Sequence, residues 1–341
     1  MRPSIPDDDA TIRVGAAAAG TARNVRWALA GAGAAVAVGL LAVWILWPRP
    51  APPPPPAAAR SAPPTAAAPA APAPPAPVPV VTADEAAIRD HVATTLTAFR
   101  FAPDPRIVVL DFPTLHEQGA MLNRVAALTE KAGLPRDRVL DDAALATAIK
   151  ASGDTPDTYY FGHDYGATEL RRFFTLADAA HIALGPEEQK LRALLGRLGW
   201  FAPHTMGGMI SVPRVPQAEV AALDAAARAT ILHHELAHGL YFSDSGYAAY
   251  VHQFWASMLT EAERAGIRRF LGSEDYDTAD EVLMQNEMQA YLMFTADPRF
   301  FQAANVGMTP ARRQQLATAF LAGMAPGWLR DSLAQDIAAL R

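Results

Sequence analysis

Residues 217–239 read QAEVAALDAAARATILHHELAHG, an alanine- and leucine-rich stretch that follows Pro216 and ends on a glycine. A stretch rich in helix-forming residues, with a proline before it and a glycine at its end, is typical of a helix. Within it, apolar residues recur every three or four positions and lead directly to His234 and His238. Residues four apart lie on one face of a helix, so the pattern places both histidines on its inward-facing side.

The segment 233–238, HHELAH, matches the pattern H-E-x-x-H with His234, Glu235 and His238. Two imidazoles one helical turn apart can bind a single metal ion, and this pattern is typical of zinc sites. Glu235 is then placed to deprotonate a water at the metal. The alternative is a pair of core histidines that bond to other protein groups. Because one metal satisfies both imidazoles, the sequence favours zinc.

A third metal ligand is expected from a later predicted helix, residues 278–295. Glu287 in this segment has apolar neighbours at the i±3 and i±4 positions. A carboxylate on an apolar face is costly to bury unless a charge or a metal pairs with it. We therefore predict that Glu287 completes the site with His234 and His238.

Three other residues remain open as the third ligand: Glu281, Asp244 and His252. Glu281 has a structural role available, because Thr278 to Glu281 has the form of a capping box. Asp244 lies in the sequence Phe-Ser-Asp-Ser-Gly, which is typical of a turn that ends one helix and caps the next.

With these residues the chain resembles the gluzincins, thermolysin-like zinc metallopeptidases that pair an H-E-x-x-H helix with a glutamate on a later helix, commonly after an asparagine. The matching pair here is Asn286-Glu287, in which Glu287 lies 49 residues after His238. The resemblance is confined to these two helices. It implies a zincin-like fold and peptide-bond hydrolysis, with Glu235 as general base and later proton donor. The aspartate often found at i+4 is Tyr291 here, so the carboxylate that supports a zinc-binding histidine in this family is not visible.

A phenol or an imidazole is expected to stabilise the oxyanion of the transition state. We name Tyr291, one turn after Glu287, and Tyr247, shortly after the metal helix, as candidates. The sequence does not choose between them and the other donors near the metal helix, which are Tyr241, Tyr250 and His252.

Residues 27–47 form an uncharged stretch, WALAGAGAAVAVGLLAVWILW. As a helix it would be about 30 Å long, which matches a bilayer core, and tryptophans lie near both ends. A cleavable signal peptide has a shorter apolar region and an exit of small residues. The stretch therefore predicts a single transmembrane anchor. Four arginines precede it and only two follow in the next 35 residues, so residues 1–26 are predicted to be a cytoplasmic head.

After the anchor, residues 48–81 hold 15 of the 29 prolines, with alanine at most other positions. Such a segment favours polyproline II and cannot build a core, so we predict a disordered linker. Residues 82–341 are then a catalytic domain outside the cell membrane, either periplasmic or extracellular. This domain has 23 basic and 32 acidic residues, a net charge of −9 that argues against nucleic acid as a partner. The chain has no cysteine, so a zinc site must use histidine and carboxylate ligands.

Helical patterns dominate the domain, which predicts a mainly helical α+β fold, a zincin-like domain with a small sheet. Helices are predicted at 84–100, 114–132, 141–151, 167–181, 187–198, 217–239, 246–271, 278–295 and 309–340, the last broken at Pro326. Strands are predicted at Arg106–Phe112, Thr158–Gly162 and Met209–Val215. The strand at 209–215 is expected at an open edge, where Pro213 is tolerated and a peptide can pair as an added strand.

Three functional hypotheses follow. The first is a membrane-anchored zinc metallopeptidase that acts on a peptide or protein substrate. The second is a zinc hydrolase of a non-protein cell-envelope amide, and the third is a non-catalytic scaffold that keeps the fold. Glu235 favours the first two, because a structural metal site needs no general base beside its ligands. The sequence does not set the oligomeric state.

Overall fold

The computed structural model describes residues 77–217, 220 and 223–339 of the chain. The predicted head at 1–26, the predicted anchor at 27–47 and most of the predicted linker lie outside these residues. Within the described part, no helix combines the length and the hydropathy needed to cross a bilayer.

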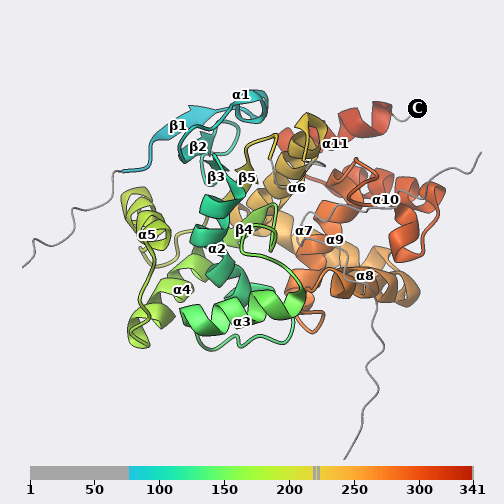
Figure 1. Ribbon diagram of the computed structural model, residues 1–341. Helices are drawn as coiled ribbons and strands as arrows, with labels where there is room; N and C mark the ends of the chain where they lie inside the picture. The colour runs from blue at the N-terminus through green and yellow to red at the C-terminus, as the bar shows by residue number, and fades with distance from the viewer. Residues whose placement is uncertain (1–76, 218–219, 221–222, 340–341) are drawn as a thin grey trace, which may run out of the picture. The chain divides into compact units, whose positions relative to one another are not determined.

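One small mixed sheet of five strands lies at the centre of the fold (Figure 1), with the strand order β1-β2-β3-β5-β4. β1 is parallel to β2, β2 is antiparallel to β3, β3 is parallel to β5, and β5 is antiparallel to β4. The strands are β1 (Val80–Ala83), β2 (Thr97–Phe101), β3 (Ile107–Phe112), β4 (His163–Gly166) and β5 (Gly208–Pro213). The sheet therefore begins two residues inside the segment predicted as linker.

Helices make up most of the rest. They are α1 (Glu85–Asp90), α2 (Leu115–Thr129), α3 (Asp142–Ser152), α4 (Ala167–Ala179), α5 (Pro186–Leu198), α6 (Ala225–Ser243), α7 (Ser245–Met258), α8 (Glu261–Ser273), α9 (Glu281–Phe294), a short 3₁₀ turn η1 (Ala303–Val306), α10 (Pro310–Gly323) and α11 (Trp328–Ala339). Figure 1 shows α2–α5 on one side of the sheet and α6–α11 on the other. The predicted α+β class, with helices predominant and one small sheet, is confirmed.

The prediction that β5 is an open edge strand is wrong. β5 pairs with β3 on one side and β4 on the other, and all six of its residues are buried. An apolar run buried on both faces reads the same at an edge and in the centre of a sheet, so the pattern did not separate the two. Pro213 occupies the last position of the strand, where its missing N–H costs little.

Other predicted elements also differ from the structure. The strand expected at 158–162 is irregular, and β4 begins at the next residue, His163. The helix expected at 84–100 stops at Asp90 and gives way to β2. The helix expected at 246–271 is two helices, because Thr260 forms a capping box with Glu263 and so begins α8. The break near Pro326 is confirmed.

α6 lies directly on the sheet and carries the H-E-x-x-H residues. Its contact with β5 is made through two glycines, since a Cβ on Gly208 would lie 2.7 Å from the backbone of Gly239. α6 begins at Ala225 rather than at 217, because the Asp224 carboxylate accepts a hydrogen bond from Ala227 N at 2.8 Å and caps the helix. Gln217 and Val220 pair with each other in a short β-bridge instead.

A buried ion pair fixes α6 to β3. The Arg228 guanidinium donates to both oxygens of Asp111 at 2.9 Å, and the two side chains are 2% and 0% exposed. Arg228 also donates to the carbonyls of Ile88, Arg89 and Pro213. One guanidinium therefore joins α1, β3, β5 and the start of α6.

We expect Asp111→Asn to lower the free energy of unfolding by about 3–5 kcal/mol, because it leaves the buried Arg228 charge without its counter-charge. Denaturant unfolding measures the loss. Asp178→Asn is the matched control, since Asp178 pairs with Arg192 at the surface and its removal should change stability by less than about 1 kcal/mol. Equal losses in the two variants would contradict this role of the pair.

Candidate metal centre

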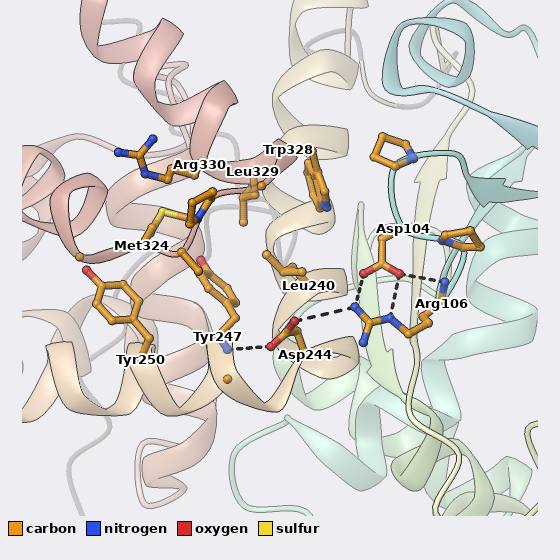
Figure 2. Close-up of a pocket in the computed structure, with 17 residues that line it drawn as sticks. Asp104, Arg106, Leu240, Asp244, Tyr247, Tyr250, Met324, Trp328, Leu329 and Arg330 are labelled. Atoms are coloured by element: carbon orange, nitrogen blue, oxygen red, sulfur yellow. Dashed lines mark hydrogen bonds and ion pairs between the residues drawn. The ribbon is translucent and has the colours of Figure 1, made fainter.

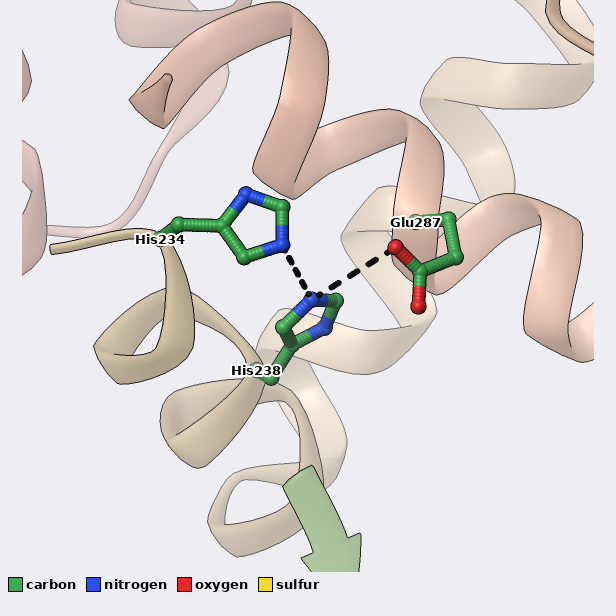
Figure 3. Close-up of side chains that lie close together, drawn as sticks. All are labelled: His234, His238 and Glu287. Atoms are coloured by element: carbon green, nitrogen blue, oxygen red, sulfur yellow. Dashed lines mark hydrogen bonds and ion pairs between the residues drawn. The ribbon is translucent and has the colours of Figure 1, made fainter. Parts of the chain in front are cut away.

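The structure brings His234, His238 and Glu287 together between α6 and α9 (Figure 3). The two histidine Nε2 atoms lie 3.1 Å apart, and Glu287 Oε2 lies 3.8 Å from His238 Nε2. One ligand atom from each residue lies within 4.8 Å of the others. The i, i+4 spacing thus places the imidazoles as predicted, and Glu287 is the carboxylate that joins them.

All three side chains are almost completely removed from water. Their exposed fractions are 1% for His234, 0% for His238 and 0% for Glu287. Burial lowers the pKa of His238 to about 4, and burial, followed by the neighbouring histidines, lowers the pKa of His234 well below its ordinary value. Both imidazoles are therefore neutral near pH 7, which is the form that binds a metal.

Glu287 is a carboxylate without adequate protein partners. Neither of its oxygens has a hydrogen bond among the described residues. Burial first, and then the charges of Asp164 and Glu130, raise its pKa well above the ordinary range, while the Tyr276 phenol lowers it. Such a group is costly in a protein interior unless a cation pairs with it.

The arrangement fits a zinc ion. Two neutral imidazole nitrogens and one carboxylate oxygen are the donor set of many catalytic zinc sites, which keep a fourth position open. Figure 3 shows the Glu287 carboxylate on the side toward which the two Nε2 atoms face, and both of its oxygens lack a hydrogen-bond partner among the described residues. The zinc prediction is thus supported by unpaired polar atoms as well as by spacing.

A hydroxyl fixes the tautomer of His234. Thr295 Oγ1 donates to the carbonyl of Ala290 at 3.0 Å and lies 2.8 Å from His234 Nδ1. Because its own hydrogen is used, Thr295 accepts from Nδ1–H, which leaves the Nε2 lone pair of His234 free for a metal. Sequence reasoning missed Thr295, which follows α9 directly and lies eight positions after Glu287.

His238 has a different support. Its Nδ1 lies 3.6 Å from Asp164 Oδ1 and has no hydrogen-bond partner among the described residues, and the Asn286 amide partly offsets the lowering of its pKa by burial. Asp164 lies on β4, far away in the sequence, and Asn286 directly precedes Glu287. A carboxylate is therefore present near His238, but it comes from the sheet rather than from position 291.

Glu235 lies next to this cluster. It is 2% exposed, its Oε2 has no hydrogen-bond partner among the described residues, and it forms a second close group with Asp164 and His238. Burial first, then Asp164, Glu287 and Glu130, raise its pKa well above the ordinary value. A carboxylate with one unpaired oxygen beside such a cluster is suited to take and return a proton.

The two candidate oxyanion donors lie in different surroundings. The Tyr291 ring packs edge-on against His234 with centroids 4.7 Å apart, and its hydroxyl has no hydrogen-bond partner that satisfies the geometry. The Tyr247 hydroxyl donates to Gln289 at 2.8 Å. Tyr247 also lines a separate cavity of about 550 Å³, where Figure 2 shows it beside Tyr250 and opposite Trp328. Of the two, Tyr291 is the one in contact with a ligand.

The competing third ligands have other partners. Glu281 accepts from Trp255 Nε1 at 2.6 Å and from Arg268 at 2.5 Å. The capping box predicted for Glu281 is wrong, because the carboxylate of Asp280 caps α9. Asp244 caps α7, as its turn sequence indicates, and His252 lies 2.6 Å from the Tyr241 hydroxyl.

No family model, curated protein or solved structure matches the chain.

We expect Glu287→Ala to remove most of the zinc from a protein that otherwise holds about one ion per chain, because it deletes one of three ligands. Elemental analysis after dialysis measures the zinc. Glu281→Ala is the matched control from the same helix and should keep full zinc. The reverse result would show that Glu287 is not a ligand.

We expect Thr295→Val, which keeps the shape of the side chain, to weaken zinc binding by about 10- to 100-fold through loss of the acceptor that fixes His234. Competition with a chromophoric chelator gives the affinity. Thr318→Val on α10, where the hydroxyl bonds only to Gln314 O, is the control and should leave the affinity unchanged. Unchanged affinity in Thr295→Val would mean that the hydroxyl does not orient the ligand.

Proposed function

We propose that this chain is a zinc-dependent metallopeptidase with a zincin-like catalytic domain. The observation that carries the proposal is the convergence of His234, His238 and Glu287 on one point, with Glu235 beside them. The gluzincin resemblance of the sequence rests on these same residues. A metal site with a purely structural role gains nothing from an additional buried carboxylate that has an unpaired oxygen.

The residues present support hydrolysis of a peptide bond. A bound zinc ion supplies Lewis-acid activation of a water molecule and of the scissile carbonyl. Glu235 accepts a proton from the attacking water as its oxygen bonds to the carbonyl carbon. As the C–N bond breaks, Glu235 returns that proton to the leaving amine. Tyr291, which packs against His234, is the nearer of the two candidate donors for stabilising the oxyanion.

A peptide substrate is favoured by the position of β4. It is the edge strand of the sheet on the metal side, since Asp164 at its second position lies 3.6 Å from His238 Nδ1. Among the described residues, its second edge has no strand partner. All four residues of β4 are buried, so an extended peptide would pair with this edge, alongside α6, once the segments that cover it have moved. β4 thus takes the role that the sequence assigned to the strand at 209–215.

The membrane location belongs to the same proposal. The uncharged stretch at 27–47 and the excess of arginines before it support a single-pass anchor, with the head at 1–26 in the cytoplasm and the catalytic domain outside. The second candidate is a zinc hydrolase of a cell-envelope amide, which would use the same ligands and Glu235. The location outside the membrane is what favours that alternative.

We expect Glu235→Gln to reduce cleavage of a quenched peptide library by at least about 100-fold, because the amide cannot take a proton from water. Zinc content should stay near one per chain, since Glu235 is not among the three ligands. Glu261→Gln, at the exposed start of α8, is the control and should leave both readouts unchanged.

Removal of zinc from the wild type by a chelator should abolish cleavage, and added zinc should restore it. A wild-type protein that holds zinc but cleaves no peptide would favour the envelope-amide hydrolase or the scaffold. Full cleavage by Glu235→Gln would refute its role as general base.

A further inference from the structure

The carboxylate of Glu235 is covered by the backbone of one residue. A Cβ built on Gly162 would lie 2.0 Å from Glu235 Oε1 and 2.8 Å from its Cδ, so only glycine permits this approach. Glu235 itself is 2% exposed. A scissile peptide bond must come within about 3.5 Å of the attacking water and of the base. The space that such a bond requires beside Glu235 is occupied by residue 162.

Gly162 ends a segment that connects α3 to β4. We call residues 155–162 the strap. Its aromatic side chains are buried, with exposed fractions of 1% for Tyr159, 4% for Tyr160 and 4% for Phe161. The ammonium group of Lys131 lies 4.3 Å from the centroids of both tyrosine rings. The strap therefore packs inward over the metal centre, and the buried Lys131 ammonium group stabilises the rings of Tyr159 and Tyr160.

The main chain of the strap is fixed to α2 by two side-chain amides. Asn123 Nδ2 donates to Pro156 O at 2.7 Å. Gln118 Nε2 donates to Phe161 O at 3.1 Å and to Tyr160 O at 3.4 Å. At the surface, His116 Nδ1 on α2 lies 3.0 Å from Asp157 Oδ1 on the strap. The hydrogen bonds that hold the main chain of the strap thus come from a single helix, while its aromatic side chains also contact Lys131 and Tyr276.

The strap lacks the backbone bonding of the strand that follows it. Outside the β4–β5 ladder, residues 159–162 make no backbone–backbone hydrogen bond among the described part of the chain. β4 pairs residue by residue with β5. A segment held by side chains opens at a lower free energy than a paired strand, so the strap can leave while the sheet stays intact.

We propose that the strap is an autoinhibitory cover, which closes the metal centre in this structure and must leave α2 before a substrate reaches Glu235. This inference rests on the proposed function, because only a hydrolytic centre needs the space beside that carboxylate. The proposed function concerns the chemistry performed at the site, whereas this inference concerns the access of a substrate to it.

Loosening the strap tests the cover. Asn123→Ala removes the donor to Pro156, so hydrogen–deuterium exchange at the amides of 159–162 should be faster by about tenfold, with β4 and β5 unchanged. Transfer of zinc to a chelator and peptide cleavage should be faster in the same variant. Asn305→Ala, which removes the amide that caps η1, is the control and should change none of these.

Locking the strap is the converse test. The chain has no cysteine, so a short bis-maleimide joins only the two thiols of His116→Cys/Asp157→Cys. The cross-linked protein should keep its zinc, exchange the strap amides at least about tenfold more slowly, and lose peptide cleavage and zinc transfer to a similar degree. Each single cysteine variant, modified with the same reagent, controls for the label.

The outcomes separate the two proposals. A protein that binds no zinc refutes the proposed function. The cover is then tested by the exchange rates of the strap amides alone. Strap amides that exchange no faster than those of β4, in both the wild type and Asn123→Ala, overturn the cover. Cleavage or zinc transfer at an undiminished rate in the cross-linked protein overturns it as well, since the site is then reached without opening the strap.

Discussion

The structure depends on the burial of the Glu287 carboxylate between α6 and α9. Its side chain is 0% exposed, and neither oxygen has a hydrogen-bond partner among the described residues that would offset the loss of water. An unsatisfied buried polar group costs about 1–3 kcal/mol and a charged one more, which is a large part of a stability of about 5–15 kcal/mol. Two neutral imidazoles facing this carboxylate form a donor set that a divalent cation would satisfy, so metal binding and folding are expected to be coupled.

Several contacts hold α9 at the position that this centre requires. Asp280 caps its first turn, and Arg313 of α10 donates to the carbonyls of Leu292 and Thr295 at its end. The second of these bonds holds the residue whose hydroxyl orients His234. α10 thereby holds in place the residue that lies against His234.

The sequence predicted the parts of the site that depend on local spacing. His234 and His238 lie on one helical face at any i, i+4 separation, and Glu287 was identified because a carboxylate among apolar neighbours needs a partner. Asp164 could not be identified in this way. It approaches His238 only because β4 pairs with β5, and β5 packs on α6. Glu281 lies outside the cluster of His234, His238 and Glu287, but the role predicted for it was wrong, since it bonds to Trp255 and Arg268 rather than capping α9.

For the fold too, the sequence predicted the features that depend on local pattern. Helix existence and the α+β class follow from periodicity, whereas strand order does not. The buried run that forms β5 satisfies the same pattern in the centre of a sheet as at its edge, and the irregular segment at 158–162 has a strand-like composition without a partner strand. In both places the structure depends on which segments pair with each other. Local patterns in a single sequence do not carry that information.

Burial also sets two requirements of this centre against each other. Removing the ligands from water keeps the imidazoles neutral and strengthens their interaction with a cation, yet it closes the approach to Glu235. One side of the centre is the α6–α9 contact, where the bonds of Thr295 with His234 and of Tyr247 with Gln289 fix the ligand helices and their surroundings. Movement there would separate the ligands themselves. On the other side the strap approaches Glu235 through Gly162 and contributes none of His234, His238 and Glu287, so movement of the strap would give access without separating the three of them.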